Sequence, residues 1–112
     1  MKKLILAGLL VALSSVAVFA DTFTLKNGTS STFYEVYISL SDSDDWGDEL
    51  LGDEYVIEPG DSMTFDVAVK LNSTTIDIGA VDEDENAYTI YDRQVRNGAT
   101  VTITLADLDE DA

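Results

Sequence analysis

The acidic segment from Ser39 to Glu54 is the part of the sequence whose residue types are best suited to chemistry. It carries seven carboxylates, the only tryptophan and two glycines within sixteen residues. Oxygen ligands are what Ca²⁺ prefers, and a divalent cation relieves the repulsion between crowded carboxylates. The sequence therefore predicts calcium as a candidate cofactor, with five aspartates as its ligands: Asp42, Asp44, Asp45, Asp48 and Asp53.

The spacing of these aspartates matches the twelve-position calcium loop only in part. Asp42 and Asp44 fall at its first and third positions and Gly47 at its sixth. Trp46, however, occupies the fifth position, where an oxygen ligand belongs, and Asp53 at the twelfth is too short for the usual bidentate contact. The segment is not an EF-hand. Two alternatives stay open, namely a looser oxygen cage and a solvated loop of local Ser and Asp turns that binds no ion.

A second acidic turn at 82–86 repeats the beginning of such a loop, with oxygen-bearing side chains at alternate positions. Ala87 stands where the calcium loop needs glycine. A short connection rich in turn-forming residues explains this stretch equally well. Calcium binding here is the weaker of the two metal hypotheses.

Trp46, Leu50 and Leu51 form a small apolar group inside the acidic segment. The favoured interpretation is a lid over one end of the core, because a large aromatic in a small domain usually finds apolar cover. Trp46 could instead be an exposed anchor for a protein or sugar partner, or a neighbour of a bound cation. These three residues are accordingly the predicted partner-binding residues.

Composition excludes several classes of function. The chain has no cysteine and no histidine, so Ser-His-Asp or Cys-His catalysis cannot be built and zinc loses its usual ligands. Its net charge of −16, from 22 acidic and 6 basic residues, repels nucleic acid and favours a cationic or basic protein partner. So small a domain has little room for a substrate cleft. We therefore expect a non-enzymatic protein without a catalytic residue.

The first twenty residues have the pattern of a signal peptide. Lys2 and Lys3 precede an apolar run, and Val18-Phe19-Ala20 supplies a cleavage site, which predicts a secreted or periplasmic protein. The apolar run is too short for a membrane span. Removing it leaves 112 − 20 = 92 residues, enough for one small domain at 21–112, with an acidic tail at its end.

Hydrophobic residues alternate with a period of two along most of the chain, and turn signals recur every eight to twelve residues. This pattern predicts an all-β fold, an antiparallel β-sandwich of about seven strands that is Ig-like or C2-like. Tyr55–Ile57 is one expected short strand. Tyr34 and Tyr88 are in phase with the core, and Tyr37 and Tyr91 face outward. If successive strands are antiparallel, the two acidic loops begin at opposite ends of the sandwich.

Several short motifs resemble a group of small exported bacterial domains of the hypothetical secreted type. Their most specific part is the Trp-Gly-x-x-Leu-Leu-Gly element at 46–52, accompanied by Asn27-Gly-Thr29 and Pro59-Gly60-Asp61-Ser62. The resemblance implies a compact all-β domain with the tryptophan loop as its signature, and it implies no activity. Members of the group often carry cysteines in the later strands and a glycine after the 82–86 turn, and this chain has neither.

Overall fold

The computed structural model describes residues 21–111, so the predicted signal peptide at 1–20 lies outside the described residues. None of the helices in this described range is long and apolar enough to cross a membrane. Two single-turn 3₁₀ helices, η1 (Leu71–Ser73) and η2 (Leu105–Asp107), accompany the strands. The strands are β1 (Asp21–Asn27), β2 (Phe33–Leu40), β3 (Ser62–Val67), β4 (Ile76–Asp82), β5 (Ala87–Arg93) and β6 (Thr100–Ile103).

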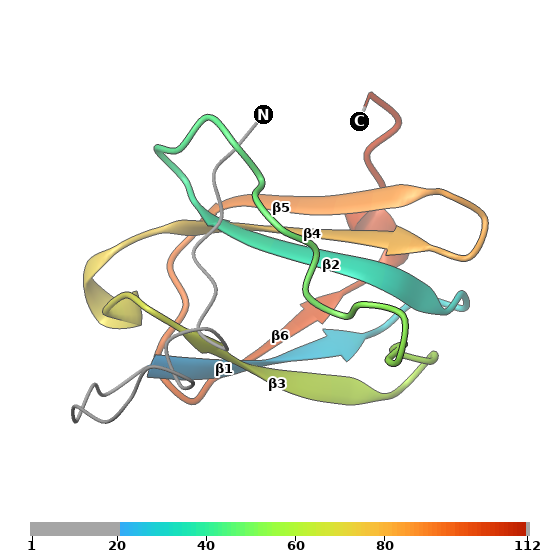
Figure 1. Ribbon diagram of the computed structural model, residues 1–112, viewed down its shortest axis with the longest axis horizontal. Coiled ribbons are helices and arrows are strands. Elements are labelled where there is room, and N and C mark those ends of the chain that lie inside the picture. The colour runs from blue at the N-terminus through green and yellow to red at the C-terminus, as the bar shows by residue number, and fades with distance from the viewer. Residues whose placement is uncertain (1–20, 112) are drawn as a thin grey trace.

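The strands form two three-stranded sheets that lie as two layers (Figure 1). One sheet has the order β3-β1-β6 and the other β2-β4-β5. β1 pairs antiparallel with β3 but parallel with β6, whereas the second sheet is antiparallel throughout. The prediction of a β-rich fold is confirmed. Six strands rather than seven are found within 21–111, and one pair departs from the expected antiparallel arrangement.

The expected strand at Tyr55–Ile57 is missing. Only Ile57 pairs with another strand, exchanging two backbone hydrogen bonds of 2.9 and 3.0 Å with Phe33. Tyr55 and Val56 are exposed. The reason is the path of the chain, because this segment follows the outer edge of β2 before crossing to the other sheet, where β3 pairs with β1. So short an apolar run provides one bridge and no ladder.

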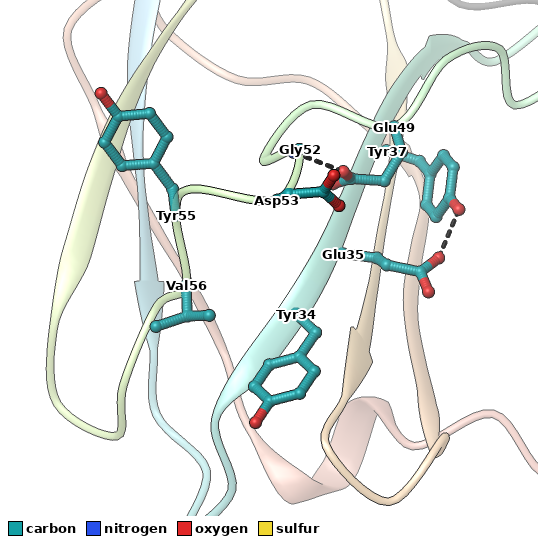
Figure 2. A pocket seen from close by; sticks show the side chains of 8 residues that line it. All are labelled: Tyr34, Glu35, Tyr37, Glu49, Gly52, Asp53, Tyr55 and Val56. Carbon is teal, nitrogen blue, oxygen red and sulfur yellow. Dashed lines mark hydrogen bonds between the residues drawn. The ribbon is translucent and has the colours of Figure 1, made fainter.

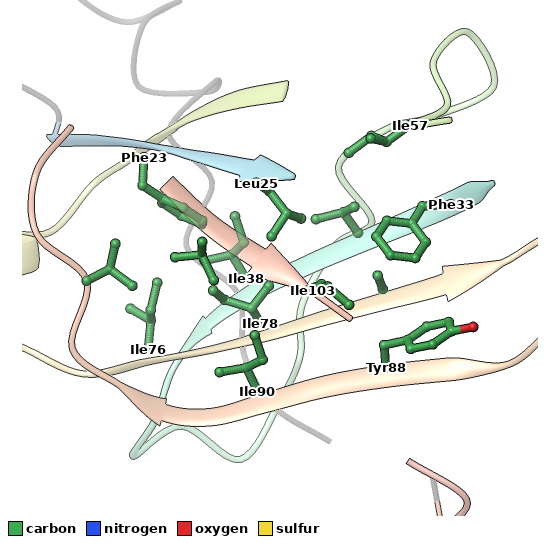
Figure 3. Packing of buried hydrophobic residues seen from close by; sticks show 14 of the residues in the cluster. Phe23, Leu25, Phe33, Ile38, Ile57, Ile76, Ile78, Tyr88, Ile90 and Ile103 are labelled. Carbon is green, nitrogen blue, oxygen red and sulfur yellow. The ribbon is translucent and has the colours of Figure 1, made fainter. Parts of the chain in front are cut away.

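The core lies between the two sheets, where the inward-facing side chains of both meet (Figure 3). Alternation along β1 buries Phe23 and Leu25, and β4, which is buried on both faces, contributes Ile76 and Ile78 from the opposite side. Each large aliphatic or aromatic side chain that is fully buried contributes about 1.5–3 kcal/mol of transfer free energy. No disulfide is needed to explain the fold.

The tyrosine predictions are mostly confirmed. Tyr88 is buried against Phe33, with ring centroids 5.5 Å apart, and Tyr37 and Tyr91 lie on the outer face. Tyr34 was expected in the core and is 51 % exposed. A register shift between Phe33 and Glu35 places Phe33 inside instead, and such a bulge reverses which face the neighbouring side chain occupies.

The two acidic loops begin at opposite ends of the sheet, as the strand parity predicts. The first follows β2, and the Ser41 backbone N–H donates to the Thr75 carbonyl just before β4. The second joins β4 to β5, and the Glu83 N–H donates to the Thr32 carbonyl just before β2. A common site formed by the starts of both loops is therefore excluded by the topology.

Asp82 organises the β4–β5 turn and is almost completely buried. Its carboxylate accepts hydrogen bonds from the backbone N–H groups of Asp84 and Asn86, both at 2.9 Å, and from the Tyr88 hydroxyl at 2.8 Å. Burial by itself would raise the pKa of Asp82, but these hydrogen bonds together lower it below its ordinary value. Burial and the hydrogen bond to the Asp82 carboxylate raise the pKa of Tyr88 to about 12. The turn is thus held by the chain's own donors, which explains the aspartate at position 82.

Replacing Asp82 by asparagine is expected to destabilise the domain by about 1–3 kcal/mol at neutral pH, because an amide nitrogen would face one of these donors. A lowered folded-state pKa contributes stability above the ordinary value near 3.8 and loses it as the pH falls through the lower folded value. Urea unfolding at pH 7 and pH 3 should therefore show a smaller acid loss in Asp82→Asn than in the wild type. Asp84→Asn, in the exposed part of the same turn, is the matched control. Equal acid losses in Asp82→Asn and the wild type would contradict this account.

Candidate functional site

Trp46 lies on the outer face of the β2-β4-β5 sheet, half-buried against the middle strand. It packs over Gly79 of β4, where an added Cβ would come within 3.4 Å of the indole ring. A glycine inside a strand weakens the strand but permits this close approach. Trp46 is therefore not a lid over one end of the core, because it covers the outer surface of the sheet.

Tyr37 and Tyr91 flank Trp46 from the two neighbouring strands. The Tyr37 ring on β2 lies 6.4 Å from the indole, centroid to centroid, with the planes tilted by 57°. The Tyr91 ring on β5 lies 6.1 Å from the indole with a tilt of 42°. Tyr37 and Gly79 are direct partners in the β2–β4 ladder, so Tyr37 lies beside the position over which Trp46 packs. We refer to Tyr37, Trp46 and Tyr91 as the aromatic cluster.

The aromatic cluster borders a groove of about 330 Å³ on this face, which we call the sheet-face groove. Gly79 and Val81 of β4 contribute to its lining, together with Ala87 and Thr89 of β5. Apart from hydroxyl groups, these side chains are aliphatic or aromatic. Alternation along the strands explains the arrangement, because residues two apart share one face of a sheet.

The hydroxyl groups of the sheet-face groove all donate to carboxylates. The Tyr37 hydroxyl donates to Glu35, and the Thr89 hydroxyl donates to Asp109 at 2.8 Å. The Tyr91 hydroxyl donates to the same Asp109 oxygen at 3.3 Å. Burial, the bond to Glu35 and the charges of Glu35 and a neighbouring glutamate raise the pKa of Tyr37 to about 12. The bond from Thr89 lowers the pKa of Asp109, with smaller contributions from other donors.

A second groove, of about 550 Å³, lies at the outer edge of β2 and shares Tyr37 with the first (Figure 2). We call it the edge groove. Tyr34 and Tyr55 are 51 % and 58 % exposed, and Figure 2 shows them on opposite sides of it. Its polar lining is acidic and includes Asp53. The two grooves therefore follow one another around β2, with carboxylates beside both.

Glu49 fastens the acidic segment to the edge of β2. One carboxylate oxygen accepts from the backbone N–H groups of Val36, at 2.8 Å, and Leu51, at 2.7 Å. The other accepts from the Gly52 N–H at 2.6 Å, a bond drawn in Figure 2. The Leu50 N–H also donates to the Val36 carbonyl. A charge-assisted clamp of this kind fixes the segment that carries Trp46 and covers part of an otherwise unpaired strand edge.

Replacing Glu49 by glutamine is expected to loosen this segment and cost about 1–3 kcal/mol, since the amide supplies one acceptor oxygen in place of two charged ones. Two measurements check this, namely the free energy of unfolding and the rate of proteolysis within 41–54. Glu54→Gln removes the same charge from an exposed position nearby and should leave both unchanged. Equal effects of the two substitutions would show that charge alone, and not the clamp, controls the segment.

The five predicted metal ligands are distributed along the acidic segment. Asp42, Asp44, Asp48 and Asp53 are exposed and Asp45 is half-buried. Among residues 21–111, no three Asp or Glu side chains converge in a way that could hold a metal ion. In this part of the chain the five aspartates therefore do not form a cluster of three or more carboxylates.

The three predicted partner-binding residues occupy different environments. Leu51 is buried in the core and Leu50 packs against the core, so these two residues anchor the acidic segment to the interior of the domain. Trp46 lies on the outer face. Sequence reasoning missed Gly79, although a glycine within a strand signals close approach of another group. It also missed Glu35, Glu49 and Asp109, whose roles depend on contacts that no sequence spacing reveals.

Comparison with known proteins supports the fold. No protein family model matches the chain, and no curated protein matches it. An NMR structure of a protein from Eubacterium rectale is similar in three dimensions, with a TM-score of 0.57 and 17 % sequence identity. The match covers 80 % of this chain and 84 % of that one. At this identity the similarity concerns the arrangement of the strands alone.

Proposed function

We propose that this protein is an exported, non-enzymatic β-sandwich module of the small secreted type that holds a basic partner on the Trp46 face of its β2-β4-β5 sheet. The observation that carries the proposal is the aromatic cluster, in which Trp46 lies over Gly79 between Tyr37 and Tyr91. Carboxylates flank it on both sides, Glu35 on β2 and Asp109 beyond β5.

Charge and aromatic surface together favour a cationic partner. A net charge of −16 attracts basic surfaces at long range and raises their rate of association. Aromatic rings then bind ammonium or guanidinium groups over their faces, with about 0.5–2 kcal/mol for each favourable contact. Trp and Tyr are also the residues on which binding energy usually concentrates in protein interfaces.

The Trp46 face suits this role better than the edge of β2. That edge is already occupied in part, by the Leu50 bond to Val36 and by the Ile57 pairing with Phe33. An incoming strand would have to displace both. The sheet-face groove requires no such rearrangement.

Titration with an oligolysine peptide tests the proposal, with calorimetry as the readout. Trp46→Ala leaves the net charge unchanged, so binding driven only by the acidic surface would not respond to it. We expect a loss of affinity of about tenfold or more for this variant, with Val56→Ala as an exposed aliphatic control outside the sheet-face groove. Equal affinities of wild type and Trp46→Ala would refute the proposal.

Calcium stabilisation stays a prediction of the sequence, and a thermal melt with calcium, magnesium or chelator tests it. Binding to the folded form alone at a hundredfold excess over Kd would stabilise the protein by about 2.7 kcal/mol. Asp44→Asn with Asp48→Asn should then remove the shift. A melting temperature indifferent to millimolar calcium would refute the hypothesis.

A further inference from the structure

We infer that the sheet-face groove binds a trimethylammonium group, a cation without hydrogen-bond donors, of which choline is the simplest soluble example. The inference rests on the proposed function, because it names the chemical group by which the Trp46 face would recognise a cationic partner. The geometry that supports it is the aromatic cluster, whose three rings come from three different segments and all line one groove.

The tilts of the rings are suited to a rounded cation. The planes of Tyr37 and Tyr91 are inclined to the indole by 57° and 42°, so the three faces do not stack as a flat platform. A flat sugar ring is best matched by a coplanar aromatic surface. All three rings line one small groove, and quaternary ammonium ligands are recognised by aromatic cages built from several rings.

The hydroxyl groups of the groove distinguish among cations. Those of Tyr37, Thr89 and Tyr91 all direct their protons to Glu35 or Asp109, and these two carboxylates lie outside the groove lining. They make the local potential negative while the lining itself stays largely hydrocarbon. The side chains of the lining offer a primary ammonium, which carries three N–H donors, no acceptors other than hydroxyl oxygens. A trimethylammonium group has no such donors.

The surrounding charges also select against an anion attached near the cation. The turn next to Asp109 adds Glu110 and Asp111, and this acidic turn borders Thr89 and Tyr91. A phosphate beside the trimethylammonium group, as in phosphocholine or a phosphatidylcholine headgroup, would approach these carboxylates. We therefore assign the groove to a trimethylammonium group that has no phosphate close to it.

The test compares choline with its neutral carbon isostere, 3,3-dimethylbutan-1-ol, at constant ionic strength, using Trp46 fluorescence and calorimetry. Choline should bind saturably and about tenfold or more tightly than the isostere, the factor expected of a cation–π contribution. Phosphocholine and n-butylammonium should both bind more weakly than choline. A trimethyllysine peptide should bind more tightly than its unmodified form.

Variants then locate the site. Tyr91→Leu removes a ring that is 52 % exposed and keeps Trp46 as the reporter, and it should weaken choline binding several-fold. Tyr91→Phe retains the ring and should bind nearly as well as the wild type. Tyr55→Leu removes a similarly exposed ring, at 58 %, from the edge groove and should have no effect.

Each outcome decides the inference. The inference is overturned if choline does not bind, or if choline and the isostere bind with equal affinity. It is also overturned if Tyr91→Leu and Tyr55→Leu lose the same amount of choline affinity. If oligolysine binding depends on Trp46 but choline does not bind, the inference fails and the proposed function stands. If choline binds through the aromatic cluster while oligolysine is indifferent to Trp46, the proposed basic partner fails and the ligand class stands.

Discussion

Asn27→Asp should destabilise the folded protein by about 3 kcal/mol or more at neutral pH, although it replaces an amide group by a carboxylate of nearly equal size. Asn27 is completely buried. Its amide Nδ2 donates to the carbonyls of Ser31, at 2.7 Å, and Ile57, at 2.8 Å. Its Oδ1 accepts from the backbone and the hydroxyl of Thr29. A carboxylate oxygen in place of Nδ2 would face two carbonyl oxygens with no proton between them.

The expected size follows from the cost of leaving a buried charge without a compensating cation, which is about 3–5 kcal/mol. Burial and the two carbonyl oxygens would raise the folded-state pKa of the new carboxyl group. The charged form is therefore the one penalised, so the penalty should be largest at neutral pH and should shrink as the pH falls and the group takes up a proton.

Urea unfolding at pH 7 and at pH 4.5 measures both effects. Asn72→Asp is the matched control, because it adds the same charge at an exposed position where only its Oδ1 accepts a bond from Asn97. We expect a small change for this control. A comparable loss in both variants would show that added negative charge, and not the contacts of Asn27, destabilises the protein.

Local patterns in the sequence predict the strands well and predict their connections poorly. Alternation along β1 predicts its buried side chains, because it depends only on neighbours two residues apart, whereas β4 is also buried at Asp77 and Gly79 on its other face. Asn27-Gly28 and Asn97-Gly98 are two of the recurring turn signals, and this dipeptide is typical of hairpins. Neither turn closes a hairpin, however, because each joins strands that belong to different sheets. Sheet membership depends on long-range pairing, such as the parallel β1–β6 contact, which leaves no local signature.

The candidate site was predictable only in its components. Trp46, Tyr37 and Tyr91 were each identified as residues of interest, with the two tyrosines on outward faces. Their meeting over Gly79 depends on how far the chain after β2 folds back over the sheet. That path is fixed by Glu49, whose three backbone donors lie in two separate segments. Side-chain contacts of this kind have no periodicity, so a single sequence does not reveal them.

Gly28 provides the second large effect, and its cause differs from that of most turn glycines. Gly52 and Gly60 have positive φ angles of 66° and 85°, where any side chain strains the backbone. Gly28 is required for space instead, since an added Cβ would lie 2.7 Å from the Thr102 Cγ2 and 2.8 Å from the Ile103 carbonyl oxygen. The Gly28 N–H donates to that same carbonyl at 2.7 Å, so the contact is part of the junction between β1 and β6.

Gly28→Ala should therefore cost about 2–3 kcal/mol, near the upper end of the range for overpacking, because one of the two clashing atoms belongs to the backbone. Gly52→Ala has no atom within 4 Å of the added Cβ and should cost only the strain of its positive φ, about 1 kcal/mol. Adding Thr102→Ser to Gly28→Ala removes the Cγ2 contact and should restore part of the loss, while the carbonyl contact remains. If Gly28→Ala proves no more destabilising than Gly52→Ala, or if Thr102→Ser restores nothing, the close packing of this turn against β6 is not what requires glycine.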